Sequence, residues 1–293
     1  MATEYNFDEI TFCVFCRVDN QERKENLQAM ISFYRNCDKN VKFIISEDGK
    51  ESVVPSIINL TENDVYTFTQ NNDEWRKSEG YNKCIKLAKT NTLVFNDVDA
   101  IVHPEQILEA HNQMVNDPKI GLLYPYNGLF LCTDKEIKTN FINNNCNYDI
   151  LQNAFPQILA DYDGDVSKKS TKDVLYSKHI NSTINGILIG HIYSKGGCVM
   201  GRRDNIIKCN GYNPKFKGWG YEDDEFPFRV SKLGYVVGRT TGFKKPCWHL
   251  HHFDGSGSKK ETQPYYDENN NEVMMVQQMD REQLEIYKNS WRL

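Results

Sequence analysis

The first 118 residues constrain the fold most, because short apolar runs alternate there with stretches of helical spacing. Each apolar run has the length and the β-branched or aromatic content of a buried strand. Between the runs, apolar residues recur three and four positions apart, as on one face of a helix. The expected strands are 10–17, 41–45, 65–68 and 92–95, and the expected helices are 21–34, 78–88 and 104–115.

Strands that alternate with helices predict an α/β fold with a Rossmann-like, mainly parallel central sheet flanked by helices. In such sheets, ligands bind beyond the carboxyl ends of the strands. Asp48 and the segment 96–99 (Asn-Asp-Val-Asp) both fall at expected strand ends. We therefore expect the site to include these acids.

The rest of the chain is less regular. Residues about 126–185 are rich in Asn, Asp, Lys and Ser, and we interpret them as a polar insertion and lid. A Gly-punctuated strand at 196–201, a short helix at 203–209 and a final helix within 278–291 are expected after it. We predict one domain over 1–293, made of two halves, 1–118 and 119–293.

Composition excludes several classes of function. The formal net charge is −5, which implies no general attraction to nucleic acid. No apolar run approaches the ~18 residues of a membrane span, and the polar, acidic N-terminus does not resemble a signal peptide, so we expect a cytoplasmic protein. The nine cysteines are irregularly spaced, and Cys13 and Cys16 lack a second pair at zinc spacing. We expect reduced, mostly buried thiols.

An unusual acidic packet lies at 218–225, Gly-Trp-Gly-Tyr-Glu-Asp-Asp-Glu. The spacing after it fits an amphipathic helix, whose first turn favours negative charge. The flanking glycines allow close backbone approach to a ligand, and Trp219 offers a flat apolar face of the kind that sugars stack on. This packet is either a solvated helix start or a general-base and acceptor-sugar site, with equal weight on its own evidence.

Two segments offer metal ligands. Asp97 and Asp99 follow an apolar strand, and in an extended segment His249 and His251 would point to the same side. Mixed oxygen and nitrogen ligands suit Mn²⁺ better than Mg²⁺, with Zn²⁺ as the other candidate. Short acidic turns and surface histidines are common, so neither segment is decisive alone.

Taken in order, four segments resemble the inverting β-1,4-galactosyltransferase family, in particular its xylosylprotein branch. They are 15–20, 96–99, 196–226 and 249–251, which are similar to the family's P-F-R-x-R, D-V-D, G-G…N-G…G-W-G-x-E-D-D-E-F and H-L-H segments. Chondroitin polymerase and polypeptide N-acetylgalactosaminyltransferase domains share looser versions. The resemblance implies a GT-A fold, a UDP-sugar donor and Mn²⁺. It also implies that residues 1–118 form the nucleotide-sugar-binding half and that residues 119–293 complete the acceptor and metal sites.

Carried over residue by residue, the resemblance implies specific roles. Asp99, His249 and His251 would bind Mn²⁺. Asp223 would be the general base, within a catalytic group that also holds Glu222 and Asp224. The implied donor-binding residues are Arg17, Asp19, Asp48, Arg76, Lys77, Asn82, Asp97, Gly196, Gly197, Trp219 and Gly220.

These residues together predict an inverting glycosyltransferase that uses a UDP-sugar donor and a glycan or glycoconjugate acceptor. A hexose and an N-acetylhexosamine both remain open as the transferred sugar. The alternatives are a nucleotidyltransferase, a non-catalytic carbohydrate-binding protein and a metallohydrolase. The first has no evident use for the acidic packet, the second needs no metal ligands, and no H-E-x-x-H helix supports the third.

Overall fold

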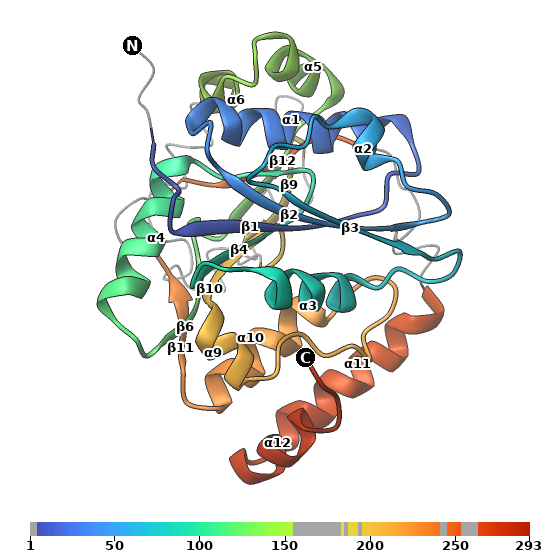
Figure 1. Cartoon of the computed structure of the whole chain (residues 1–293), viewed down its shortest axis with the longest axis vertical. Helices are drawn as coiled ribbons and strands as arrows, with labels where there is room; N and C mark the ends of the chain where they lie inside the picture. Colours follow the sequence, from blue (N-terminus) through green and yellow to red (C-terminus); the bar gives the residue numbers. More distant parts are fainter. Residues whose placement is uncertain (1–4, 155–182, 185–186, 193–194, 241–244, 253–262) are drawn as a thin grey trace.

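A computed structural model describes residues 5–154, 183–184, 187–192, 195–240, 245–252 and 263–293 of the chain. Two sheets organise these residues (Figure 1). The larger has seven strands in the order β11-β6-β10-β4-β1-β2-β3. Its strands are β1 (Ile10–Cys16), β2 (Lys42–Gly49), β3 (Val65–Gln70), β4 (Thr92–Asn96), β6 (Ile120–Tyr124), β10 (Cys198–Arg202) and β11 (Val236–Arg239).

Most neighbours in this sheet are parallel, which confirms the predicted fold class. β3, β2, β1 and β4 form a parallel block, and β11 is parallel to β6. β10 runs antiparallel to both β4 and β6 and so joins the two parallel groups. The parallel block comes from the alternating first 118 residues, as expected.

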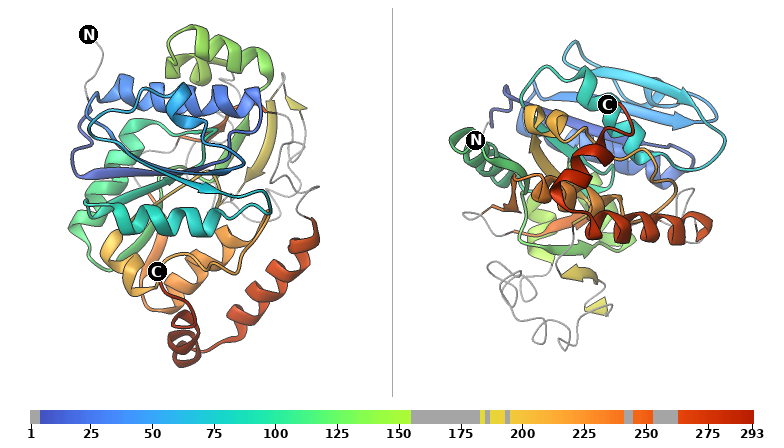
Figure 2. Two further views of the ribbon diagram at one scale, coloured as in Figure 1. Left: turned by 45° about the vertical axis from the view of Figure 1, so that its right-hand side comes forward. Right: turned by 90° about the horizontal axis from the view of Figure 1, so that it is seen from below.

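Helices cover both faces of this sheet (Figures 1 and 2). α1 lies on one side, with α5 and α6 beyond it. α3 lies on the other side, toward α10, α11 and α12. The helices are α1 (Gln21–Cys37), α2 (Val54–Ile57), α3 (Lys77–Leu87), α4 (Pro104–Asn116), α5 (Lys135–Asn143), α6 (Tyr148–Ala154), α9 (Arg203–Lys208), α10 (Glu222–Lys232), α11 (Gln263–Gln278) and α12 (Arg281–Lys288).

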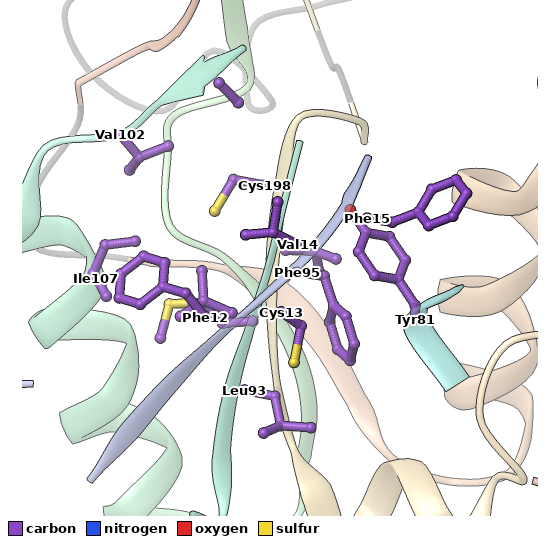
Figure 3. Close-up of a cluster of buried hydrophobic side chains, with 14 of the residues drawn as sticks. Phe12, Cys13, Val14, Phe15, Tyr81, Leu93, Phe95, Val102, Ile107 and Cys198 are labelled. Carbon is purple, nitrogen blue, oxygen red and sulfur yellow. The ribbon is translucent and has the colours of Figure 1, made fainter. Parts of the chain in front are cut away.

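The core forms where alternate residues of the central strands meet the helices. Figure 3 shows Phe12 and Ile107 on one side of β1, and Cys13, Phe95 and Tyr81 on the other. All five are almost completely buried. α3 approaches β1 closely because it has a glycine at position 80, where a Cβ would lie 2.1 Å from the Phe15 ring.

The smaller sheet meets the larger one at the acidic turn. Its order is β5-β12-β7-β9-β8, and β5 follows β4 after a three-residue turn at 97–99. β12 pairs antiparallel with β5 and parallel with β7. The strands are β5 (Ala100–Ile101), β7 (Leu129–Cys132), β8 (Thr183–Ile184), β9 (Ile187–Ile192) and β12 (Cys247–His249).

The segment interpreted as an irregular insertion is ordered in its first part. Residues 129–154 form β7, α5 and α6. The Asp134 side chain caps α5 by accepting a hydrogen bond from the Ile137 N–H, and Phe141 and Leu151 are fully buried. The sequence offers few apolar residues here, so the helical period is weak. In the rest of the predicted lid, residues 155–182 lie outside the described residues, and Thr183–Ile184 form β8.

The end of the chain has more helix than expected. α11 begins at Gln263, before the predicted final helix, and α12 follows with a capping box at Asp280 and Gln283. No helix among the described residues has the length and apolarity to cross a membrane.

Candidate active site

The turn after β4 fixes Asp97 and Asp99 at the junction of the two sheets. The Asp97 N–H donates to the carbonyl of Gly197, the residue just before β10, at 2.8 Å. Asn96 donates through Nδ2 to the carbonyls of Asp97 (2.8 Å) and Ala100 (2.9 Å). These bonds hold the turn from inside, so the two aspartate side chains face different partners.

Asp99 lies against two imidazoles. Its Oδ2 is 3.4 Å from His249 Nε2 and 3.1 Å from His252 Nε2, and one ligand atom from each residue lies within 4.8 Å of the others. The pairing of β12 with β5 creates this contact, because His249 stands opposite Ala100 and the Leu250 N–H donates to the Asp99 carbonyl at 2.8 Å.

The ionisation of Asp99 is coupled to that of the two imidazoles. Burial alone would favour the neutral acid, but the imidazoles of His249 and His252 hold the pKa of Asp99 well below its ordinary value. Burial likewise opposes a charged His249, whose pKa the Asp99 carboxylate raises well above its ordinary value. Asp99 offers an anionic oxygen, and each imidazole offers a ring nitrogen once it has released its proton, which makes a chemically fitting set for Mn²⁺ or Zn²⁺.

The structure places His252, and not His251, beside Asp99. β12 ends at His249, so the two-residue alternation of a strand does not extend to position 251. The His251 N–H donates to Thr133 Oγ1 at 3.0 Å, and burial lowers the pKa of its imidazole. The geometry therefore favours a ligand set in which His252 replaces the predicted His251.

Lys77 gathers three carboxylates on the other side of the turn. Its Nζ lies 3.1 Å from Asp97 Oδ1, 3.2 Å from Glu222 Oε1 and 3.4 Å from Asp223 Oδ2. The Tyr81 hydroxyl also donates to Asp97 Oδ1 at 3.0 Å. Residues from α3, the β4–β5 turn and α10 thus converge on one ammonium group.

Mutual repulsion and burial shift the ionisation of this cluster. Burial, opposed by Lys77 and reinforced by Glu222 and Asp97, raises the pKa of Asp223 to about 8. Burial favours neutral Lys77, but Asp223, Asp97 and Glu222 raise its pKa well above the ordinary value. A carboxylate with a pKa near 8 is a stronger base than an ordinary aspartate, as a general base requires.

The four consecutive acids have separate environments, because successive helical residues point about 100° apart. Glu222 and Asp223 face Lys77, whereas Asp224 pairs with the exposed Lys195 at 2.7 Å. Glu225 is buried and bonds Arg229 Nε at 2.5 Å. The Arg229 guanidinium also donates to the carbonyls of Cys209 and Gly211, so the fourth acid anchors the 209–211 segment.

The backbone before α10 has an uncommon conformation. Gly218, Gly220 and Tyr221 have φ values of 66°, 101° and 73°, and Tyr221 lies in the left-handed region that disfavours side chains. This path leaves Trp219 43% exposed, with its ring parallel to Tyr266 of α11 at 5.9 Å between centroids. The Tyr221 ring is 4.8 Å from the same tyrosine. Three aromatic rings therefore form one cluster at the start of α10.

A cavity of about 590 Å³ opens at the carboxyl ends of β1, β2 and β3, bounded by the start of α3. Asp48 lines it and is held by Arg17 Nε at 2.7 Å and by Asn71 Nδ2 at 2.7 Å. Arg17 also donates to the Asp73 carbonyl at 3.0 Å. The cavity is lined by Phe15, Ser46, Asp48, Thr69, Gln70, Asn71, Asn72, Asp73, Arg76, Glu79, Gly80 and Lys83.

The remaining predicted donor contacts divide into two groups. Arg76 lines the cavity, next in sequence to Lys77 of the acidic cluster. Asn82 does not: its side chain exchanges two 2.8 Å hydrogen bonds with the Tyr212 backbone, which points to a structural role. Asp19 lies outside the cavity lining, beside Arg23 at 3.7 Å.

Gly196 and Gly197 support the turn through their backbone. Gly197 has φ +83°, and a Cβ there would lie 2.7 Å from the Phe130 ring. Its carbonyl receives the Asp97 N–H, and the Gly196 carbonyl receives the Tyr126 hydroxyl at 2.7 Å. Glycine is required at 197 because both the conformation and the space exclude a side chain.

Sequence reasoning missed three residues of this site. His252 follows His249 by three positions and was visible as part of a histidine cluster. Tyr81 lies one helical turn after Lys77, on the same face, and could have been found from that spacing. Tyr266 comes from a distant helix, and no motif in the sequence marks it.

Comparisons with known proteins identify the segment that carries these features. A family model described as the N-terminal domain of galactosyltransferase matches residues 191–253. Beta-1,4-galactosyltransferase 7 of Drosophila melanogaster is 37% identical over 60 residues, which are 19% of this chain and 19% of that protein. The Homo sapiens protein of the same name is 40% identical over 60 residues, 19% of this chain and 18% of that protein. The match spans about a fifth of each relative.

Solved structures give broader but weaker alignments. The catalytic domain of Drosophila β1,4-galactosyltransferase 7 in complex with xylobiose has 16% identity and a TM-score of 0.45, over 83% of this chain and 71% of that chain. A mannosyltransferase from Pyrobaculum calidifontis in complex with GDP-Man and Mn²⁺ has 13% identity and a TM-score of 0.46, over 85% and 58%.

Residues 191–253, which include α10, His249 and His252, therefore carry the sequence of a glycosyltransferase. Within that class they resemble the galactosyltransferases, and the two curated relatives reported above are both β-1,4-galactosyltransferase 7. The resemblance inferred from the sequence motifs is confirmed over this segment.

Proposed function

We propose that this protein is an inverting, Mn²⁺-dependent glycosyltransferase. It transfers a hexose or N-acetylhexosamine from a UDP-sugar to a hydroxyl of a glycan or glycoconjugate, and it forms a β-linkage. One observation carries the proposal. A single turn presents Asp99 to two imidazoles, and two residues earlier presents Asp97 to the cluster that contains Asp223.

Asp99, His249 and His252 would hold the metal ion. Their ligand atoms are close enough to share one cation, and the low pKa of Asp99 keeps it anionic at neutral pH. When bound, the ion supplies Lewis-acid stabilisation of charge on a departing diphosphate. Asp97 stands next to this group and is placed to accept hydrogen bonds from a donor sugar.

The donor nucleotide would occupy the cavity at the ends of β1–β3. Its volume of about 590 Å³ is within the ~300–1,000 Å³ range of small-molecule sites. Asp48 is fixed by Arg17 and Asn71, so its carboxylate is already oriented at the cavity wall. Because Arg76 and Lys77 are adjacent at the start of α3, a diphosphate could extend from the cavity toward the acidic cluster.

Asp223 would remove the proton from the acceptor hydroxyl as that oxygen attacks the anomeric carbon. Attack from the face opposite the departing UDP inverts the anomeric centre, so an α-linked donor yields a β-linked product. Glu222 beside it would accept a hydrogen bond from the acceptor. Trp219, with Tyr221 and Tyr266 next to it, offers apolar ring surface for an acceptor sugar.

Lys77 occupies the space between the proposed donor and acceptor groups. The cleft that Asp97, Asp223, Lys77 and Tyr212 line holds only about 10 Å³, roughly one water. A hexose therefore requires this region to open. Pairing of Lys77 with an incoming diphosphate would withdraw its ammonium group from Asp223 and leave the base uncovered.

Binding and product analysis test this function. We expect UDP and UDP-sugars to raise the melting temperature only with Mn²⁺, by mass action on the folded state. A panel of UDP-Gal, UDP-GalNAc, UDP-Glc, UDP-GlcNAc and CTP then identifies the donor, and UDP release with an acceptor glycan measures transfer. Stabilisation by CTP with pyrophosphate release would instead support a nucleotidyltransferase. No nucleotide response at all would refute the proposal.

A further inference from the structure

In the described part of the chain, three side chains form hydrogen bonds to the backbone of the segment that carries the histidines. We call this set, Asn26, Lys138 and Thr133, the clamp. Asn26 of α1, which is fully buried, donates through Nδ2 to the Leu250 carbonyl at 3.2 Å and to the His251 carbonyl at 3.4 Å. Lys138 of α5, 3% exposed, donates through Nζ to the same His251 carbonyl at 3.1 Å. Two helices distant in sequence therefore hold one short stretch of backbone.

Thr133 completes the clamp from the end of β7. Its N–H donates to the His249 carbonyl at 2.8 Å, and its Oγ1 accepts the His251 N–H at 3.0 Å. The backbone between the two imidazoles is thus bonded at every residue, although β12 ends at His249. These bonds explain how a segment without regular structure can present His249 and His252 to one carboxylate.

Burying the polar groups of the clamp costs folding free energy. This cost indicates that the clamp serves to fix the position of the histidine segment. Lys138 is a buried cation that pairs with the Glu25 carboxylate at 3.2 Å, and buried charges are unfavourable unless paired. Asn26 Oδ1 has no hydrogen-bond partner among the described residues. A hydrophobic contact would fill the same space without these costs but would leave two buried carbonyls without donors.

We propose that Asn26 and Lys138 are positioning residues that set the affinity of the metal site by fixing the backbone between His249 and His252. This inference rests on the metal site of the proposed function. It gives α5, in the segment that the sequence marked only as a polar insertion, a defined role: its buried lysine orders ligands that lie more than 100 residues downstream.

The test measures Mn²⁺ affinity of the intact chain by titration calorimetry, with bound Mn²⁺ counted by electron paramagnetic resonance. Lys138→Met is compared with Lys135→Met, which removes an exposed charge from the same helix. We expect Lys138→Met to weaken Mn²⁺ binding by about 10- to 100-fold, the usual effect of removing the support of a metal ligand. Lys135→Met should bind as the wild type does, and Lys138→Arg should restore most of the affinity.

Other outcomes distinguish a failure of the clamp inference from a failure of the proposed metal site. If Lys138→Met lowers the melting temperature but keeps wild-type Mn²⁺ affinity, the lysine is only structural and this inference is wrong. If Lys138→Met does not fold, Asn26→Ser takes its place under the same criterion. If Asp99→Ala leaves Mn²⁺ binding of the chain unchanged, the proposed metal site fails, and the clamp fails with it.

Discussion

Two clusters of charged residues lie on opposite sides of the turn at 97–99. They shift the pKa of a buried carboxylate in opposite directions. At Lys77, three carboxylates share one permanent cation, and burial with mutual repulsion raises the pKa of Asp223 to about 8. At Asp99, one carboxylate faces two imidazoles, and its pKa lies well below the ordinary value although burial opposes this. In the first cluster the carboxylates outnumber the ammonium group, which favours protonation of Asp223. In the second cluster the imidazoles outnumber the carboxylate, which keeps Asp99 ionised.

The contrast shows how one short turn can serve two kinds of chemistry. Asp97 and Asp99 have the same side chain, two residues apart, and their difference comes entirely from what packs against them. We therefore expect substitutions in the two clusters to change different measurements. Those at Lys77 and Asp223 should affect proton transfer, and those at the histidines should affect cation binding.

The largest effect should come from Asp223→Asn. Asparagine keeps the shape but cannot accept the acceptor proton, so we expect kcat to fall by about 10²- to 10⁴-fold while UDP affinity in Mn²⁺ stays the same. Steady-state kinetics and calorimetry measure the two quantities. Asp224→Asn is the matched control, because that neighbouring acid pairs with Lys195 at the surface. Normal turnover in Asp223→Asn would remove Asp223 from the role of base.

The second prediction compares the contributions of His252 and His251 to Mn²⁺ affinity. We expect His252→Ala to weaken Mn²⁺ binding by about 100-fold, the upper end of the effect seen for supporting residues, since it removes a ligand. His251→Ala should have a much smaller effect, because the contacts of residue 251 with Thr133, Asn26 and Lys138 are made by its backbone. Calorimetric titration with Mn²⁺ measures both. The opposite ranking would restore the His249–His251 pair that the sequence predicted.

A smaller effect concerns the pH dependence of turnover. At saturating Mn²⁺, kcat/KM should rise with pH as free Asp223 loses its proton, with a midpoint near the pKa of about 8. Lys77 lowers that pKa, whereas Glu222 and Asp97 raise it. Lys77→Met should therefore move the rising limb to higher pH, and Lys77→Arg should keep it in place. An unmoved limb in Lys77→Met would show that the ammonium does not control the base.

The smallest expected effect is on stability. Asp223 has a higher pKa folded than unfolded, so the folded state binds its proton more tightly between about pH 4 and 8. Its contribution to stability is thus greatest at low pH and is lost as the pH rises through 8. Asp223→Asn should then melt a few degrees above the wild type at pH 8 but not at pH 5, by metal-free calorimetry. Equal differences at both pH values would contradict the raised pKa.

Much of the fold could be predicted from local pattern. β1, β2 and β4 are buried on both faces, and their continuous apolar runs mark them. α5 and α6 were not predicted, because few apolar residues define their buried faces, and the start of α5 depends on the polar cap Asp134. β11 is mostly half-exposed and gains its order from pairing with β6, which no local signal reveals.

The site was predicted less evenly. The motifs identified the acidic turn, the four-acid helix and the histidine segment, and they placed Asp99 with His249, but they did not reveal the other contacts among these segments. Strand alternation favoured His251, and only the end of β12 at His249 places His252 beside Asp99. Lys77 was expected at the donor, yet its contacts with Glu222 and Asp223 depend on where the fold places the first turns of α3 and α10. Tertiary placement, not residue type, decides these roles.

The left-handed conformation of Tyr221 sets folding stability against the aromatic contact that its side chain makes. A non-glycine residue there costs roughly 1 kcal/mol or more, which glycine would not incur. Glycine would also remove the ring that lies against Tyr266. A search for higher thermal stability would therefore favour glycine at this position, and the ring surface proposed for the acceptor would lose one of its three members.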